Sequence, residues 1–249
     1  MIFLLIGCNK PTEPSAHPVR ISDLDQMEQI SVPSGAFEMG ANRDDKTADA
    51  DEIPQHKVYL DSFWLDRTEI TNAMYTRCVT AKRCTPPAHS DRYSKPEYAN
   101  HPVLGVAWTQ AQSYCMWAGR RLPTEAEWER AARGTDGRIY PWGNFPPEKN
   151  LLNFNQQMND TTAVGSYLDG ASPYGALDMA GNVWEWAADW YDVYPGGDAN
   201  ASSDFGQKYR VMRGGSWSGT GNFVRSAYRN RFDPANSYDV IGFRCSRSP

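Results

Sequence analysis

The sequence lacks a surplus of positive charge and lacks any internal repeat. Its 249 residues include 25 Lys and Arg against 30 Asp and Glu, for a formal net charge of −5. Binding to a phosphate backbone requires a basic face, so this balance argues against a nucleic-acid partner. A chain of this length with no sign of a second core is expected to form one globular domain.

Long apolar runs are also missing. The apolar segment at residues 1–7 is far shorter than the ~18–20 residues that cross a bilayer. It ends in a small residue before Cys8, as bacterial lipoprotein signals do. We therefore expect residues 1–8 to be a signal with a lipidated Cys8, residues 9–29 a tether, and residues 30–249 the domain. The expected location is the cell envelope, with the lipid as the sole membrane contact; a chance cysteine in a ragged terminus is the alternative.

Cysteine and histidine are scarce, and neither has the spacing of a zinc site. Apart from Cys8 there are four cysteines, an even number in a chain expected to be exported, and these favour disulfides over metal ligation. Three pairings are open. Cys78 and Cys84 are close enough to close a local loop, and Cys115 would then join Cys245 across more than half of the domain. In the chain-entropy model so long a loop contributes about 4–5 kcal/mol.

Regular secondary structure is expected to be sparse and the core aromatic. Nine Trp, 13 Tyr and nine Phe occur in a chain whose mean hydropathy is −0.65. Thr109 is expected to cap one helix, and the capping box at residues 124–127 to start another that stops at Gly134. Periodicity and these signals predict strands at residues 31–40 and 57–65, and helices at residues 69–81, 109–118 and 124–134. Beyond residue 134 few periodic segments occur, so disulfides, buried aromatic rings or a bound metal must hold the chain.

Four blocks of sequence match a known family in order and spacing. They occupy residues 34–40, residues 117–129, residues 178–186, and residues 213–217 with 242–245. Together they resemble the formylglycine-generating enzyme, or sulfatase-modifying factor, family from about residue 30 to the end of the chain. The resemblance implies an irregular, loop-rich α+β fold of the C-type-lectin-like kind, with two or three helices around small antiparallel sheets. It also implies a long-range disulfide between Cys115 and Cys245.

The resemblance also implies that this chain lacks two catalytic cysteines. Active enzymes of the family use two cysteines five positions apart, after a Gly-Gly-Ser-aromatic turn, to bind copper(I) and oxidise a substrate cysteine. The matching positions are Gly219 and Val224, which cannot ligate a soft metal. We expect no copper and no formylglycine-generating activity. Related iron-dependent sulfoxide synthases use a His cluster whose spacing is absent among the four histidines, His17, His56, His89 and His101.

A calcium site is expected where the family holds one. The matching ligands are the side chains of Asp178 and Glu185 and the carbonyls of Gly181 and Val183. Carboxylate and carbonyl oxygens suit Ca²⁺, although the two tryptophans in this block also fit an ordinary core strand. A second family site would use Asn153 and the Phe154 carbonyl, but its remaining ligands are not matched.

The C-terminal segment is expected to carry a ligand-binding face, as in lectin-like domains of this kind. Aromatic and amide side chains there offer adaptable contacts at low entropic cost. Arg225 and Arg229 in the same segment match family positions that make internal hydrogen bonds, so they are interpreted as structural. The candidate ligand-binding residues are Trp217, Asn222, Phe223, Tyr228, Asn230, Phe232, Tyr238 and Asp239.

These observations favour a lipid-anchored binding or accessory protein for a protein or glycan ligand. One alternative is an oxidoreductase or maturation enzyme of the same superfamily with an unrecognised metal site. Another is the variable protein of a diversity-generating retroelement, because residues 218–240 are rich in amino acids reached by mutating the adenines of Asn codons.

Overall fold

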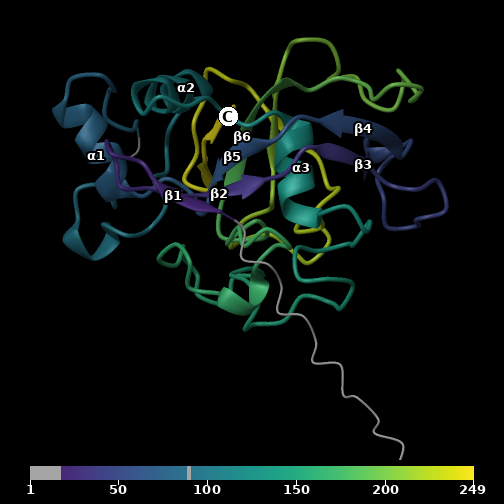
Figure 1. Ribbon diagram of the computed structural model, residues 1–249, viewed down its shortest axis with the longest axis horizontal. Helices are drawn as coiled ribbons and strands as arrows, with labels where there is room; N and C mark the ends of the chain where they lie inside the picture. The colour runs from purple at the N-terminus through teal and green to yellow at the C-terminus, as the bar shows by residue number, and fades with distance from the viewer. Residues whose placement is uncertain (1–17, 89–90) are drawn as a thin grey trace, which may run out of the picture.

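The computed structural model describes residues 18–88 and 91–249 (Figure 1). The predicted lipidation site at Cys8 lies outside the described residues. Within these residues the chain forms three α-helices and three small sheets, which long irregular segments join. The fold is thus the loop-rich α+β class predicted from the sequence. Within the described ranges, no helix has the length and apolar character needed to span a bilayer.

The first sheet joins the two ends of the domain. Its order is β1 (Val19–Ile21), β2 (Glu28–Val32), β5 (Phe63–Asp66) and β10 (Ser246–Arg247), with all neighbours antiparallel. The expected start of the domain at residue 30 is therefore too late, because β1 and the turn after it belong to the packed structure. Asp25 in this turn is fully buried and pairs with Arg120, and Met27 lies in the core.

The other two sheets carry the rest of the β-structure. β3 (Gly35–Met39) pairs with β4 (His56–Leu60). The third sheet has the order β8 (Asn230–Phe232), β7 (Arg210–Arg213), β6 (Trp184–Trp190) and β9 (Ile241–Gly242), with β9 parallel to β6. The single strand expected at residues 57–65 is two strands, β4 and β5, which belong to different sheets.

The three helices differ in how well the sequence predicted their starts. α1 (Asn72–Thr80) begins three residues later than expected, because the Thr71 hydroxyl caps it by accepting from Met74 N. α2 (Trp108–Trp117) is capped at Ala107, whose N–H donates to the Gln110 side chain, so the predicted cap at Thr109 is wrong. α3 (Glu125–Arg133) begins at the predicted Thr124 capping box and ends at Gly134. Short 3-10 turns occupy Ala50–Glu52, Pro96–Tyr98 and Leu168–Gly170.

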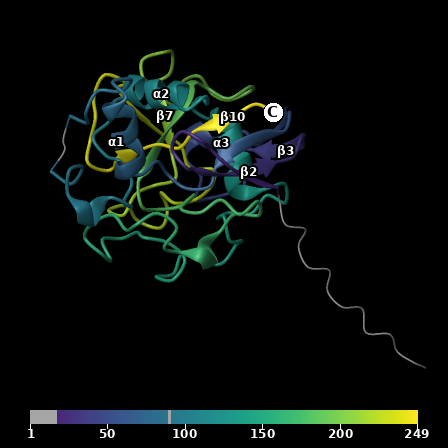
Figure 2. The same cartoon turned by 60° about the vertical axis from the view of Figure 1, so that its left-hand side comes forward.

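The core is aromatic, as the composition predicts, and both disulfides form. Cys78 is bonded to Cys84, and Cys115 to Cys245. The second bond joins α2 to the segment before β10, within a cluster that contains Tyr75, Tyr114, Trp186 and Phe243. Figures 1 and 2 show α1 and α2 on one side of the molecule, α3 beside the β3–β4 hairpin, and the irregular segments between α3 and β6 gathered below.

Candidate functional site

The loop between β7 and β8 holds the two positions where the resemblance implies catalytic cysteines. Val224 is fully buried against Leu152 and Ala180. Gly219 is fixed by backbone hydrogen bonds, from its own N–H to Ser216 O at 2.9 Å and from Asn155 N to its carbonyl at 2.8 Å. Neither Gly219 nor Val224 has a side-chain group that can bind copper or take part in thiol chemistry.

Every described cysteine is in a disulfide. Residues 18–88 and 91–249 contain no group of three or more His, Cys, Asp or Glu side chains placed to hold a metal ion. The expected loss of the family's copper chemistry stays a prediction, and it rests on the identity of Gly219 and Val224.

The predicted calcium ligands lie close together in the chain, but Glu185 forms an ion pair with Arg244. Both oxygens of Glu185 accept from the Arg244 guanidinium at 2.7 Å, and Oε2 also accepts from the Trp128 indole at 2.8 Å. Asp178 is buried with a positive φ of 56° and accepts from Gly165 N at 2.6 Å. The expected set therefore fits Ca²⁺ only in part, because Glu185 is neutralised from within the fold.

A third carboxyl group, which the sequence reasoning missed, adjoins this set. Glu69 is fully buried, and its Oε1 accepts from Asn182 Nδ2 at 2.9 Å while its Oε2 has no hydrogen-bond partner. Burial, together with the charges of Asp178 and Glu185, raises the pKa of Glu69 well above its ordinary value. Burial likewise raises the pKa of Asp178. The sequence offered no signal for Glu69, which was expected to be the first residue of a helix.

Asn153 and Phe154, the residues predicted for a second calcium site, make different kinds of contact. Asn153 is fully buried; its Nδ2 donates to Asp160 O at 2.8 Å, its carbonyl accepts from Asn182 N, and its Oδ1 has no partner. Phe154 is half-buried and packs in the apolar cluster around Val224. Asn153 therefore lies next to Asn182, which also contacts Glu69.

The predicted ligand-binding residues divide into two aromatic groups. Phe223 and Tyr228 pack together with ring centroids 5.1 Å apart, and both lie against Trp184. Phe232 and Tyr238 form a second pair at 4.8 Å. Trp217 is half-buried, and its indole N–H has no partner. The side-chain oxygens of Asn222 and Asn230 accept from Arg225 Nε and Arg231 N respectively, so both amides are used locally.

A cavity of about 820 Å³ opens beside the second aromatic group. Tyr238 and Asp239 are the two predicted residues that line it. The sequence reasoning missed other lining residues, among them Tyr98, which donates to Asp160 at 2.7 Å, and Arg92, which pairs with Asp160 at 3.1 Å. The lining residues are Asn72, Ala88, Asp91, Arg92, Tyr93, Tyr98, Pro102, Leu104, Thr161, Asn236, Ser237, Tyr238 and Asp239.

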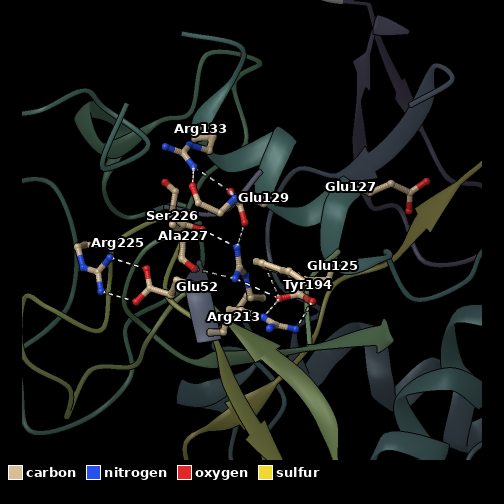
Figure 3. Close-up of polar contacts among 12 residues, drawn as sticks. Glu52, Glu125, Glu127, Glu129, Arg133, Tyr194, Arg213, Arg225, Ser226 and Ala227 are labelled. Atoms are coloured by element: carbon tan, nitrogen blue, oxygen red, sulfur yellow. Dashed lines mark hydrogen bonds and ion pairs between the residues drawn. The ribbon is translucent and has the colours of Figure 1, made fainter. Parts of the chain in front are cut away.

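Arg225 and Arg229, the two arginines interpreted as structural, form ion pairs inside the fold. Arg225 donates to both oxygens of Glu52 at 2.7 Å, and Arg229 donates to Glu125 at 2.7 and 3.0 Å. Figure 3 shows Arg213 beside the α3 carboxylates Glu125 and Glu129, with Glu127 pointing away from them. The guanidinium groups of Arg229 and Arg213 outweigh burial and lower the pKa of Glu125. Arg225 and Arg229 thus belong to a buried ion network, which agrees with their structural interpretation.

Comparison with known proteins supports the assignment of the whole described chain to one family. Residues 15–249 match the sulfatase-modifying factor enzyme 1-like domain. The formylglycine-generating enzyme of Mus musculus is 30% identical over 278 residues, covering 88% of this chain and 74% of that protein. The inactive Cα-formylglycine-generating enzyme 2 of Mus musculus is 41% identical over 164 residues, covering 59% of this chain and 49% of that protein.

A relative with a different name matches nearly the same part of this chain as the mouse formylglycine-generating enzyme does. The serine/threonine-protein kinase Pkn1 of Chlamydia pneumoniae is 37% identical over 246 residues, which is 89% of this chain but only 38% of the kinase. This chain therefore spans well under half of that relative's length. Among solved structures, PvdO from Pseudomonas aeruginosa superimposes with a TM-score of 0.78 at 27% identity, covering 96% of this chain and all of PvdO. With its fold, its disulfides and its matched blocks, this chain belongs to the sulfatase-modifying factor enzyme 1-like domain family.

Proposed function

We propose that this protein is a ligand-binding or accessory member of its family that does not generate formylglycine. The observation that carries the proposal is the packing at Gly219 and Val224. A copper(I) centre needs thiolate ligands, and here one of the two positions is a valine buried in an apolar cluster and the other is a glycine without a side chain. A missing ligand could be compensated by a nearby side chain, but the neighbours of Val224 are Leu152, Ala180 and aromatic rings.

The relatives support a role without the family's oxidation chemistry. One mouse relative is named as inactive and is 41% identical over the part that it shares. The chlamydial relative carries a region like this chain within a longer protein named as a kinase. A domain kept in such settings is consistent with binding or positioning a partner.

The cavity beside Tyr238 supports the proposed ligand-binding role. Ligand sites are usually concave, with aromatic surfaces and a small number of placed polar groups. Tyr93, Tyr98 and Tyr238 supply rings here, while Asp91 and Asp239 supply carboxylates. We propose that this cavity receives a segment of a protein or glycan ligand.

We further propose that the chain is a lipoprotein of the cell envelope, held to the membrane by lipid on Cys8. The proposal rests on the apolar run before Cys8 and on two disulfides, which persist in oxidising compartments. Labelled palmitate should enter the wild-type protein in cells and should not enter Cys8→Ser. Equal labelling of the two proteins contradicts the anchor.

The proposed absence of formylglycine-generating activity is tested with a sulfatase-derived cysteine peptide, copper(I) and oxygen. Mass spectrometry should detect no aldehyde product from this protein, while the mouse formylglycine-generating enzyme converts the peptide under the same conditions. The double variant Gly219→Cys/Val224→Cys serves as a matched probe of the loop. We expect it to bind copper(I) where the wild type does not, because only then are two thiols present. Turnover by the wild-type protein overturns the proposal.

A further inference from the structure

Two asparagines of the chain lie in the pattern Asn-x-Ser/Thr, with a residue other than proline in the middle. They occupy residues 159–161, Asn-Asp-Thr, and residues 200–202, Asn-Ala-Ser. This pattern is the acceptor for N-linked glycosylation of exported proteins. The modifying enzyme must reach both the asparagine carboxamide and the hydroxyl two positions later, so the exposure of these two groups decides which triplet can be used.

The fold closes the first triplet. Thr161 is 4% exposed, and its hydroxyl lies 2.9 Å from His101 Nδ1. The carboxylate of Asp160, the middle residue, accepts from the Tyr98 phenol at 2.7 Å and pairs with Arg92 at 3.1 Å. An enzyme can reach the Thr161 hydroxyl only after these contacts open together, and such an opening is rarer than that of an exposed turn.

The second triplet lies in an exposed turn of the segment that joins β6 to β7. Asp198 and Asn200 are both exposed. Asn200 donates to Asp198 Oδ1 from its main-chain N at 2.8 Å and from its Nδ2 at 3.2 Å, and Ala201 N donates to the Asp198 carbonyl at 3.0 Å. All three bonds are local to the turn, so the turn can open without disturbing the core.

Ser202, which supplies the hydroxyl of this triplet, is half-buried and thus less enclosed than Thr161. Its hydroxyl accepts from Asp204 N at 3.1 Å and interacts with the Tyr191 phenol. Asp204 in turn pairs with Arg231 at 2.8 Å, which anchors the loop directly after the triplet. The loop is therefore held at its base, while the asparagine of the triplet stays exposed.

We propose that Asn200 is the acceptor of an N-linked glycan and that Asn159 is not. The donor is an oligosaccharide joined through its anomeric carbon to a polyprenyl diphosphate. Asn200 Nδ2 forms the bond to that carbon, the bond from the carbon to the diphosphate oxygen breaks, and the electron pair leaves with the diphosphate. One Nδ2 proton passes to a base of the modifying enzyme.

In the cell this modification rests on the export proposed above, because the pattern is used in secreted chains. It does not depend on the proposed ligand-binding role, since residues 198–204 are not among those that line the cavity beside Tyr238. A reaction with purified protein needs no export. Failure of export, which cell fractionation reads, and failure of glycosylation are therefore separate results.

The test incubates the purified, folded full chain with an oligosaccharyltransferase that accepts the plain triplet and with its lipid-linked oligosaccharide. Glycopeptide mass spectrometry should find sugar on Asn200, with an occupancy about tenfold or more above that of Asn159. Asn200→Gln and Ser202→Ala should lose this modification, whereas Ser202→Thr keeps the hydroxyl and should retain it. Asn159→Gln is the matched control and should be modified as the wild type is.

Unfolded peptides separate the effect of sequence from that of structure. Synthetic peptides covering residues 154–166 and 195–207 should both accept sugar, because neither triplet is then closed by a fold. An unmodified Asn200 in the folded chain overturns the proposal, and so does a 195–207 peptide that accepts no sugar. Equal occupancy of Asn159 and Asn200 in the folded chain overturns it as well, because burial of Thr161 would then not decide which triplet is used.

Discussion

Val224 is the residue around which the loop between β7 and β8 is packed. Gly215 lies directly beneath it with a φ of 78°, and a Cβ there would lie 2.7 Å from Val224 Cγ1 and 3.0 Å from the Phe223 carbonyl. The glycine therefore provides both the left-handed backbone and the space for the valine. The loop is fitted to a branched apolar side chain at a position where the family resemblance implies a thiol.

This fit gives a prediction about two glycines with the same backbone conformation. Gly215→Ala should lower the free energy of unfolding by about 2–4 kcal/mol, from left-handed strain and overpacking combined. Gly137 has a φ of 75° with nothing within 4 Å of an added Cβ. Gly137→Ala should therefore show the backbone cost alone, about 1 kcal/mol. Urea titration measures both, and equal costs for the two variants would show that Val224 does not constrain the loop.

Single residues also mark where sequence reasoning succeeded and where it stopped. The internal roles of Arg225 and Arg229 follow from matching short blocks one position at a time. The loss of thiols at Gly219 and Val224 is predicted in the same way and stays a prediction. The capture of Glu185 by Arg244 does not follow from such matching, because the two residues are 59 positions apart and each is unremarkable in its own block. Which carboxylate an arginine neutralises is decided by packing, and a single sequence carries no periodic signal for it.

At the scale of secondary structure, helix starts follow side-chain hydrogen bonds to free N–H groups. Thr124 accepts from Glu127 N at 3.1 Å, and Glu127 Oε2 accepts from Thr124 N at 2.9 Å. Thr109 was expected to play the same part in α2, but Gln110 performs it by accepting from Ala107 N. A threonine before an apolar stretch is an ambiguous signal unless a Glu or Gln follows three residues later.

The two threonines therefore form a matched pair for mutation. Thr124→Ala should cost about 1 kcal/mol of unfolding free energy, because the Glu127 N–H loses its acceptor. Thr109→Ala should change stability by less than about 0.5 kcal/mol, since the side chain is exposed and caps nothing. Chemical denaturation followed by tryptophan fluorescence compares the variants. A larger loss for Thr109→Ala would reinstate the cap that the sequence suggested.

Unlike the helix starts, the short strands have no local sequence pattern from which they could be predicted. β8, β9 and β10 have three, two and two residues, which is too short for an alternating pattern to be visible. Their partners are distant in the chain, as when β10 pairs with β5 through Ser246 and Leu65. The sequence predicted the fold class through its matched blocks, whereas the sheet order needed contacts that no local pattern encodes.

Over the whole molecule, buried arginines replace the backbone ladders that the long irregular segments lack. Arg213 donates to the carbonyls of Ser226 and Ala227 while its other bonds reach the α3 carboxylates. Arg130 and Arg133 bind the carbonyls of Pro33, Gly35, Gly40 and Gly137. A guanidinium has five donors in a rigid plane, so one side chain can hold several loop carbonyls at once. The sequence predicted disulfides, aromatic rings or a metal for this task, and the arginines are a further means that it did not reveal.

The two disulfides should differ in what they contribute to stability, because they close loops of different length. Cys115 and Cys245 are 130 positions apart, and Cys78 and Cys84 are six apart. In the chain-entropy model the first bond contributes about 5 kcal/mol and the second about 2 kcal/mol. Cys115→Ala/Cys245→Ala should therefore lower the free energy of unfolding by about 3 kcal/mol more than Cys78→Ala/Cys84→Ala in urea titrations.

Hydrogen exchange separates this entropic effect from local damage. Cys245 is also held by its backbone, since its N–H donates to Asp66 Oδ2 at 2.9 Å and its carbonyl accepts from Asp66 N at 2.9 Å. If the long disulfide acts on the unfolded chain, these amides stay protected in the double-alanine variant and protection falls uniformly with global stability. Selective loss of protection in β10 and β5 would show instead that the bond holds the C-terminal strand in place, and equal losses of stability for the two double variants would contradict the loop-length argument.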